Sequence, residues 1–238
     1  MTIETRLIEY THNGTLLEGL LARDTQQQGH RPGVLVAPAW NGRSELTDGV
    51  ASRLAGLGYA AFALDMYGKG VVPANREECA TLSHAQSHDR RHLQARMHAA
   101  LDTLRAQAEV DTARVAAVGY CFGGLCVLDL ARSGADMAGV VSFHGLLRPT
   151  PHPNAPIRAS VLALHGYDDP MAPPDQLHNF QQEMTAAQAD WQVVAFGGTM
   201  HAFTNPEAND PDFGTVYQPR ADERSWRMAT GFLAEVLG

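Results

Sequence analysis

Short apolar segments that alternate with helix-length segments constrain the fold of this chain more than any other feature. Six such segments are rich in Val, Leu, Ala and Phe and lack strict polar alternation, as expected of strands buried on both faces of a parallel sheet. They cover residues 33–37, 60–64, 114–118, 139–143, 160–164 and 192–196. Helical spacing of apolar residues predicts helices over residues 46–57, 84–108, 125–132, 175–187 and 223–237. The alternation predicts right-handed crossovers and an α/β fold with a doubly wound, mostly parallel sheet flanked by helices.

The first residues follow a different pattern. Residues 6–11 and 16–22 are strand-like and are joined across His12, Asn13 and Gly14, which predicts an antiparallel hairpin at one edge of the sheet. No internal repeat or linker divides the 238 residues, a length that suits one α/β domain. We therefore expect a single domain over residues 1–238.

Composition excludes several classes of function. The net charge of −8 speaks against a nucleic-acid partner, which would need a basic face. No apolar run reaches the about 18 residues needed to cross a bilayer, and the start, MTIETRLIEY, lacks the pattern of a signal peptide. Three cysteines make no disulfide framework and suit a reducing compartment. These features predict a soluble cytoplasmic enzyme or binding protein. We further expect a monomer or homodimer that acts on a small molecule without a cofactor.

A glycine-flanked cysteine carries the strongest chemical signal. Gly119-Tyr120-Cys121-Phe122-Gly123 directly follows a predicted strand and directly precedes a predicted helix. Such a turn lifts a nucleophile above the sheet and places it at a helix N-terminus, which favours a thiolate. The alternative is a glycine-rich turn with an incidental buried cysteine. Cys126, flanked by apolar residues, is interpreted as a packing residue.

A nucleophile of this kind needs a base and a group that orients the base. Asp168 and Asp169 follow the predicted strand at 160–164, and His201 follows the one at 192–196. A lone Asp in a loop is usually a turn or cap residue, but the order cysteine, acid, histidine is the one expected for a catalytic triad in such a fold.

Three other histidines share a helical spacing. His84, His88 and His92 lie four residues apart and are candidate metal ligands by spacing alone. Their surroundings are polar and predicted to be solvated, so we expect no metal site.

These motifs together resemble the dienelactone hydrolase family, an α/β-hydrolase family, over essentially the whole chain. The G-x-C-x-G turn is the most specific, since most α/β-hydrolases carry serine at that position. The other matching motifs cover residues 36–42, 57–59, 64–68, 143–145, 165–173, 200–203, 225–226 and 231–233.

The resemblance implies roles for individual residues. The family's acid is followed four residues later by proline, which selects Asp169 with Pro173 rather than Asp168 as the partner of His201. The oxyanion hole is assigned to the backbone N–H groups of Trp40 and Phe122, and Trp40 and His144 are expected to wall the pocket. The expected substrate pocket contains Ala39, Tyr120, His144, Phe203 and Asn205.

Two positions depart from the family's founding members. Those enzymes carry a glutamate where this chain has Ala39, and an arginine that holds the substrate carboxylate where it has Asn205. Arg43 and Arg76 are candidate replacement cations. We therefore expect the triad Cys121, Asp169 and His201 to carry over, and the specificity for dienelactone to carry over poorly.

The leading hypothesis is hydrolysis of a small carboxylic ester or lactone through a thioester acyl-enzyme. One alternative is a carboxymethylenebutenolidase that acts on dienelactone itself. Others are a catalytically silent hydrolase fold used for binding, and a thiol redox role for Cys121 with Cys126, which are poorly placed for a disulfide.

Overall fold

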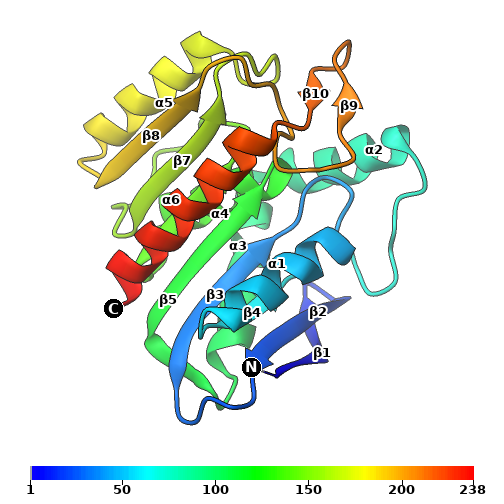
Figure 1. The fold of residues 1–238 in the computed structure, drawn as a ribbon, viewed down its shortest axis with the longest axis vertical. Helices are drawn as coiled ribbons and strands as arrows, with labels where there is room; N and C mark the ends of the chain where they lie inside the picture. The colour runs from blue at the N-terminus through cyan, green and yellow to red at the C-terminus, as the bar shows by residue number, and fades with distance from the viewer. Residues whose placement is uncertain (1) are drawn as a thin grey trace. The chain divides into compact units, whose positions relative to one another are not determined.

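The computed structural model describes residues 2–238 and divides into two compact units, one ending at Val118 and the other covering Gly119–Gly238. Each unit contains strands with helices packed against them (Figure 1). No helix in the described part of the chain is long and apolar enough to cross a membrane.

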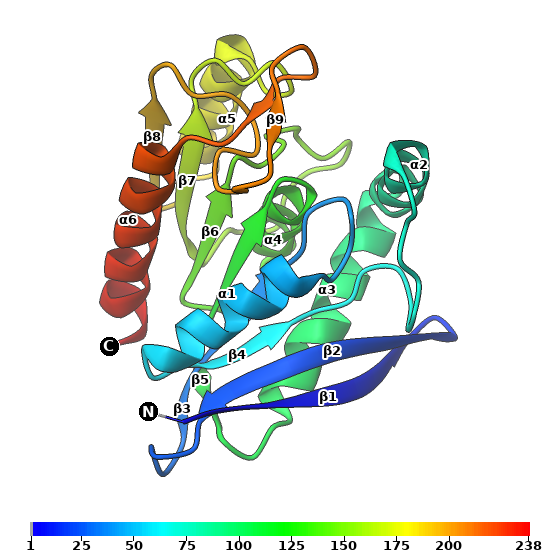
Figure 2. The same ribbon diagram turned by 45° about the vertical axis from the view of Figure 1, so that its right-hand side comes forward.

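The first unit is built on strands in the order β1-β2-β4-β3-β5. Strands β3 and β4 pair in parallel, whereas β2 pairs antiparallel with both β1 and β4. Helix α1 lies over β4 and β2, and α3 lies on the other side (Figure 2). The bounds are β1 (Ile3–His12), β2 (Thr15–Asp24), β3 (Arg31–Ala37), α1 (Glu45–Gly56), β4 (Ala60–Ala63), α2 (Arg76–Ser87), α3 (Arg90–Arg105) and β5 (Val110–Tyr120), whose last residues open the second unit.

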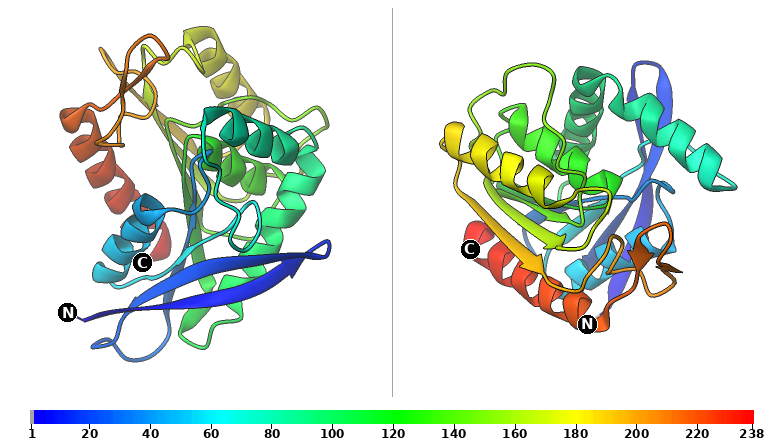
Figure 3. Two further views of the ribbon diagram at one scale, coloured as in Figure 1. Left: turned by 90° about the vertical axis from the view of Figure 1, so that its right-hand side faces the viewer. Right: turned by 90° about the horizontal axis from the view of Figure 1, so that it is seen from above.

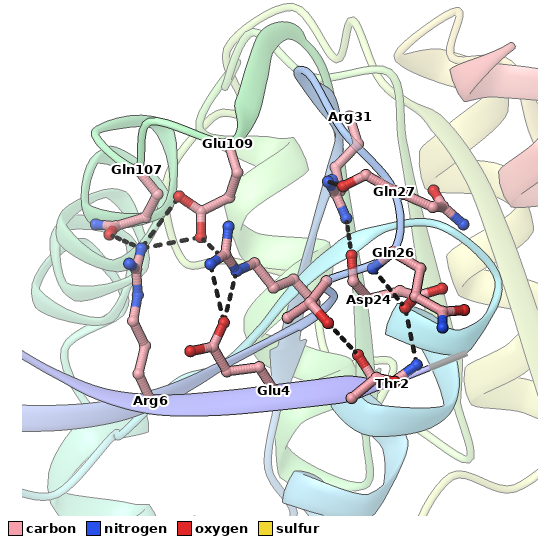
Figure 4. Close-up of polar contacts among 11 residues, drawn as sticks. Thr2, Glu4, Arg6, Asp24, Gln26, Gln27, Arg31, Gln107 and Glu109 are labelled. Atoms are coloured by element: carbon pink, nitrogen blue, oxygen red, sulfur yellow. Dashed lines mark hydrogen bonds and ion pairs between the residues drawn. The ribbon is translucent and has the colours of Figure 1, made fainter.

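The N-terminal hairpin is confirmed. Asn13 and Gly14 both have positive φ, 48° and 76°, as a tight two-residue hairpin turn requires. Polar contacts tie the hairpin to neighbouring segments (Figure 4): the Arg6 guanidinium donates to Glu109 at 2.9 Å, and Arg31 donates to the carbonyl of Asp24 at 2.8 Å. The edge strand β1 is thereby held although most of its side chains are exposed.

The single helix predicted over residues 84–108 is wrong, because two helices share that region. Helix α2 ends at Ser87, and α3 begins after Asp89, whose carboxylate accepts hydrogen bonds from the N–H groups of Arg91 and His92 at 3.0 and 3.1 Å. These hydrogen bonds to the Asp89 carboxylate favour the start of a new helix over the continuation of the first one. Helix α2 buries only Cys79, so little apolar periodicity marked its true start at Arg76.

The second unit contains the parallel strands β6 (Gly139–Phe143), β7 (Ser160–Gly166) and β8 (Trp191–Phe196). Helices α4 (Phe122–Arg132) and α5 (Pro174–Ala186) lie on one face of these strands and α6 (Pro219–Leu237) on the other (Figure 3). A short hairpin, β9 (Asn209–Asp210) with β10 (Thr215–Val216), was not predicted. The predicted α/β fold, with a mixed sheet, flanking helices and an antiparallel N-terminal hairpin, is confirmed.

A buried ionic network joins α4 to α5 in the second unit. The Arg132 guanidinium, 1% exposed, donates to both carboxylate oxygens of Glu183 at 2.9 and 2.7 Å and to Asp129 at 3.2 Å. Asn154 also donates to Glu183, at 2.8 Å, which fixes the segment after β6 to the same pair of helices.

Candidate active site

Cys121 occupies a strained turn between β5 and α4. Its φ of 55° and ψ of −115° lie outside the regions that side chains favour, and its N–H donates to the carbonyl of Phe143 at 3.0 Å. A Cβ on Gly119 would lie 2.1 Å from the carbonyl oxygen of Gly123, and one on Gly124 would lie 2.6 Å from the Cα of Gly145. The glycines are therefore needed for the strand and helix to meet this closely around Cys121.

The loop after β7 separates the two adjacent aspartates. Asp169 is buried, and its Oδ1 accepts from the N–H of Met171 at 2.8 Å. Its Oδ2 accepts from Nδ1 of His201 at 2.7 Å. Asp168 is exposed, and its backbone N–H donates to the carbonyl of Thr199 at 3.0 Å. The carboxylate that contacts the imidazole is therefore that of Asp169.

The loop that carries His201 is fixed by main-chain contacts. The N–H of His201 donates to the carbonyl of Gly214 at 3.0 Å, and its carbonyl accepts from the N–H of Val216 at 3.1 Å, so the unpredicted β10 and the glycine before it hold the histidine from both sides. A Cβ on Gly166 would lie 2.5 Å from the carbonyl oxygen of Thr199. The loops of the acid and of the histidine thus touch backbone to backbone.

The electrostatics of His201 depend on both of its neighbours. Burial alone would lower the pKa of His201, but the charge of Cys121 and the hydrogen bond with Asp169 outweigh it and raise that pKa to about 10. Because Asp169 engages Nδ1, the ring nitrogen left to face a thiol is Nε2, which is buried. The raised pKa favours the imidazolium form of His201 at neutral pH.

Two further buried histidines, His144 and His165, lie near His201. His144 shares a 2.8 Å hydrogen bond between its Nε2 and Thr204 Oγ1, and its ring centroid lies 5.1 Å from that of His201. His165 donates from Nε2 to the carbonyl of Ala172 at 2.8 Å, which ties the end of β7 to the loop of Asp169. Burial is the main cause that lowers the pKa of both rings. Sequence reasoning missed the contacts of Thr204 and His165, which no local pattern signals.

The other expected pocket residues fall in both units. In the second, Tyr120 stacks on Phe143 with centroids 4.5 Å apart, Phe203 is fully buried, and Asn205 uses its side-chain oxygen to accept from the N–H of Glu207. Phe122 is the first residue of α4, so its N–H lies in the helical turn where amides point outward along the axis.

In the first unit, the segment after β3 turns at Ala39, whose carbonyl accepts from the N–H of Gly42 at 3.0 Å. The carbonyl of Trp40 accepts from the Tyr67 hydroxyl at 2.7 Å, which fixes the orientation of that peptide. Arg43 lies close to the carboxylates of Glu18 and Asp48, at 4.0 and 3.9 Å.

Comparison with known proteins gives the family. The family model for dienelactone hydrolases matches residues 17–237. The chain belongs to the dienelactone hydrolase family. This membership confirms the resemblance and makes the protein a hydrolase of the esterase type.

Three similar proteins span most of the chain. A crystal structure of a dienelactone hydrolase-like promiscuous phosphotriesterase from metagenomic libraries is 38% identical, covers 99% of both chains and superposes with a TM-score of 0.95. A probable 2-oxo-3-(5-oxofuran-2-ylidene)propanoate lactonase from Bradyrhizobium is 28% identical over 98% of this chain and 96% of its own. A putative carboxymethylenebutenolidase from Escherichia coli is 25% identical over 87% of this chain and 78% of its own.

The structure also describes the other arginine, cysteine and histidine side chains that were singled out from the sequence. Arg76 is an exposed residue at the start of α2, and no disulfide joins Cys79, Cys121 or Cys126 to another residue in the described part of the chain. The His84 and His88 rings stack 5.9 Å apart, and among residues 2–238 no group of three or more His, Cys, Asp or Glu side chains is arranged to hold a metal ion.

Proposed function

We propose that this hydrolase cleaves a small carboxylic ester or lactone with Cys121 as nucleophile, His201 as base and Asp169 as the group that orients the base. The observation that carries the proposal is the buried 2.7 Å hydrogen bond between Asp169 and a histidine whose pKa is raised by Cys121. A catalytically silent binding protein has no need of this charged, buried arrangement.

The reaction has two acyl-transfer steps. The Cys121 thiolate attacks the carbonyl carbon, the bond to the leaving oxygen breaks, and the alcohol takes a proton from the His201 imidazolium, leaving a thioester. Water then attacks the thioester while His201 accepts its proton, and the acid is released as the thiolate and imidazolium re-form. Asp169 holds the imidazole and stabilises its charged form throughout.

We assign one donor of the oxyanion hole to the backbone N–H of Phe122. Phe122 begins α4 directly after the nucleophile, where the helix dipole favours negative charge. The resemblance to the family implies the Trp40 N–H as a second donor, and the bond from the Gly42 N–H to the Ala39 carbonyl orients the peptide that carries it. A fixed donor of this kind is worth about 3 kcal/mol in the transition state.

Substrate specificity is proposed to favour neutral esters and lactones over dienelactone. Ala39 and Asn205 supply neither the carboxylate nor the cation found in the founding enzymes, and the Asn205 side chain is engaged in its own turn. Arg43 already lies close to two carboxylates, which weakens its attraction for the carboxylate of a substrate. Comparing kcat/KM for p-nitrophenyl acetate and dienelactone tests this; a strong preference for dienelactone would contradict it.

The role of the nucleophile is tested with paired cysteine variants. Cys121→Ala should abolish ester turnover and leave the melting temperature nearly unchanged, whereas Cys126→Ala should keep most of the activity. Iodoacetamide should inactivate the wild type with labelling at Cys121 at neutral or mildly acidic pH, because a thiolate–imidazolium pair alkylates readily. Turnover by Cys121→Ala at the wild-type rate would refute the mechanism.

Hydrolysis of phosphotriesters is a second candidate activity. It rests on the 38% identical structure, whose described activity is of that kind. A p-nitrophenyl dialkyl phosphate assay on the wild type and Cys121→Ala tests it, since the same thiolate would attack phosphorus. Turnover that persists in Cys121→Ala would assign the activity to another group.

A further inference from the structure

His144 adopts a backbone conformation that a glycine would adopt at lower cost. It follows β6 with a φ of 39°, and its N–H donates to the carbonyl of Leu164 at 2.8 Å. A residue with a side chain is strained in this left-handed region, and such strain persists where the side chain is needed. The strained backbone at His144 therefore indicates that its ring has a role.

The ring contacts the loop that carries His201 at more than one point. Its Nε2 bonds to Thr204 Oγ1 at 2.8 Å, and its centroid lies 5.1 Å from the rings of both His201 and Phe203, at interplanar angles of 67° and 79°. Displacing His144 would therefore free one side of the His201 imidazole, while the hydrogen bond to Asp169 would still hold the other.

The surroundings of His144 require an uncharged ring. Its Nδ1 is buried without a hydrogen-bond partner among residues 2–238, whereas an imidazolium would present two N–H donors that both need acceptors. The titratable groups that face it are His201, His165 and Tyr120, none of which supplies a carboxylate. Burial, followed by the charge on His201, holds the pKa of His144 well below its usual range.

We infer that His144 is a positioning residue, whose uncharged ring, held by Thr204, fixes the imidazole of His201 for proton transfer. The inference rests on the proposed function, in which His201 relays the proton. It assigns no contact with substrate to His144, so its loss should lower kcat and leave KM nearly unchanged.

The hydrogen bond is tested with variants at both ends. Thr204→Val and His144→Phe should each lower kcat for p-nitrophenyl acetate about tenfold with little change in KM, and the double variant should lose no more than either single one. Thr204→Ser, which keeps the hydroxyl, should retain wild-type kcat. Thr230→Val on α6, which removes a hydroxyl bonded to the carbonyl of Arg227, is the control and should be silent.

A second measurement separates this inference from the proposed function. The proton on Nδ1 of His201, bonded to Asp169, should give a downfield NMR signal that broadens or shifts in Thr204→Val and persists in Thr204→Ser and Thr230→Val. This signal reports the position of the imidazole whether or not Cys121 is the nucleophile. The positioning role would be overturned if Thr204→Val kept the wild-type kcat and NMR signal. It would also be overturned if the variant lost kcat/KM only through a higher KM.

Discussion

Asp169→Asn tests the triad most directly, because the structure predicts how the new amide must orient. The Oδ1 position accepts from the Met171 N–H at 2.8 Å, so the oxygen of asparagine is retained there and its NH₂ group faces Nδ1 of His201. Nδ1 must then accept, which moves the ring proton to Nε2. The imidazole can no longer take a proton at the nitrogen that interacts with Cys121.

The expected magnitude follows from the wrong tautomer. Fixing the base with its proton on the reactive nitrogen costs about 10⁴-fold in kcat, while the fold survives because the amide replaces the carboxylate atom for atom. Asp168→Asn is the matched control, since the Asp168 residue is exposed and its hydrogen bond to the histidine loop is made by the backbone N–H. It should retain kcat within about twofold, as is usual for an exposed surface substitution.

The assay is steady-state turnover of p-nitrophenyl acetate by wild type and both variants, with thermal melts to confirm folding. The Nδ1 proton of His201 should disappear from the NMR spectrum of Asp169→Asn only. A larger loss in Asp168→Asn than in Asp169→Asn, or a folded Asp169→Asn that loses less than about tenfold, would refute the assigned roles.

The remaining predictions concern stability and the turn at Cys121. The folded-state pKa of His144 lies below its unfolded value, so the stability that His144 contributes is lost as the pH falls below about 6.5, at about 1.4 kcal/mol per pH unit. In urea melts across this range, the free energy of unfolding of His144→Phe should therefore change less with pH than that of the wild type. Arg132→Met leaves Asp129, fully buried, without this cation and should cost about 3 to 5 kcal/mol in urea unfolding; a cost below about 1 kcal/mol would show the network to be dispensable. Gly119→Ala should abolish turnover or folding because its Cβ meets a carbonyl at 2.1 Å, whereas Gly197→Ala, with open space around it, should be active; equal activity would contradict the packing around the turn.

The strands and the order of the candidate triad could be predicted because each leaves a local signal. Apolar runs mark β3 to β8, and Asp169 and His201 each lie directly after a strand. No local sequence signal distinguishes Asp168 from Asp169 as the partner of His201, since the difference depends on which side chain is buried against another loop. The resemblance to the family selected Asp169, and in the structure it is Asp169 that contacts His201.

Other features could not be predicted because their causes are tertiary. Strands β9 and β10 are two residues long each and exist through pairing around His201, which no periodicity reveals. The break between α2 and α3 had a signal, the N-cap Asp89, but the polar sequence around it looked continuous with the helix. The bond between His144 and Thr204 joins residues far apart in the chain and has no sequence signature.

The close approach at Gly166 has a consequence for how the enzyme can diversify. Because main-chain atoms of Gly166 and Thr199 set the spacing between the acid and histidine loops, that spacing is insensitive to the identity of nearby side chains. A half-buried side chain of the histidine loop, such as that of Asn205, can then be exchanged in a library without moving Asp169 relative to His201, whereas Phe203 is buried against His144. Selection for a new leaving group could therefore sample position 205, while Gly166 itself should tolerate no replacement.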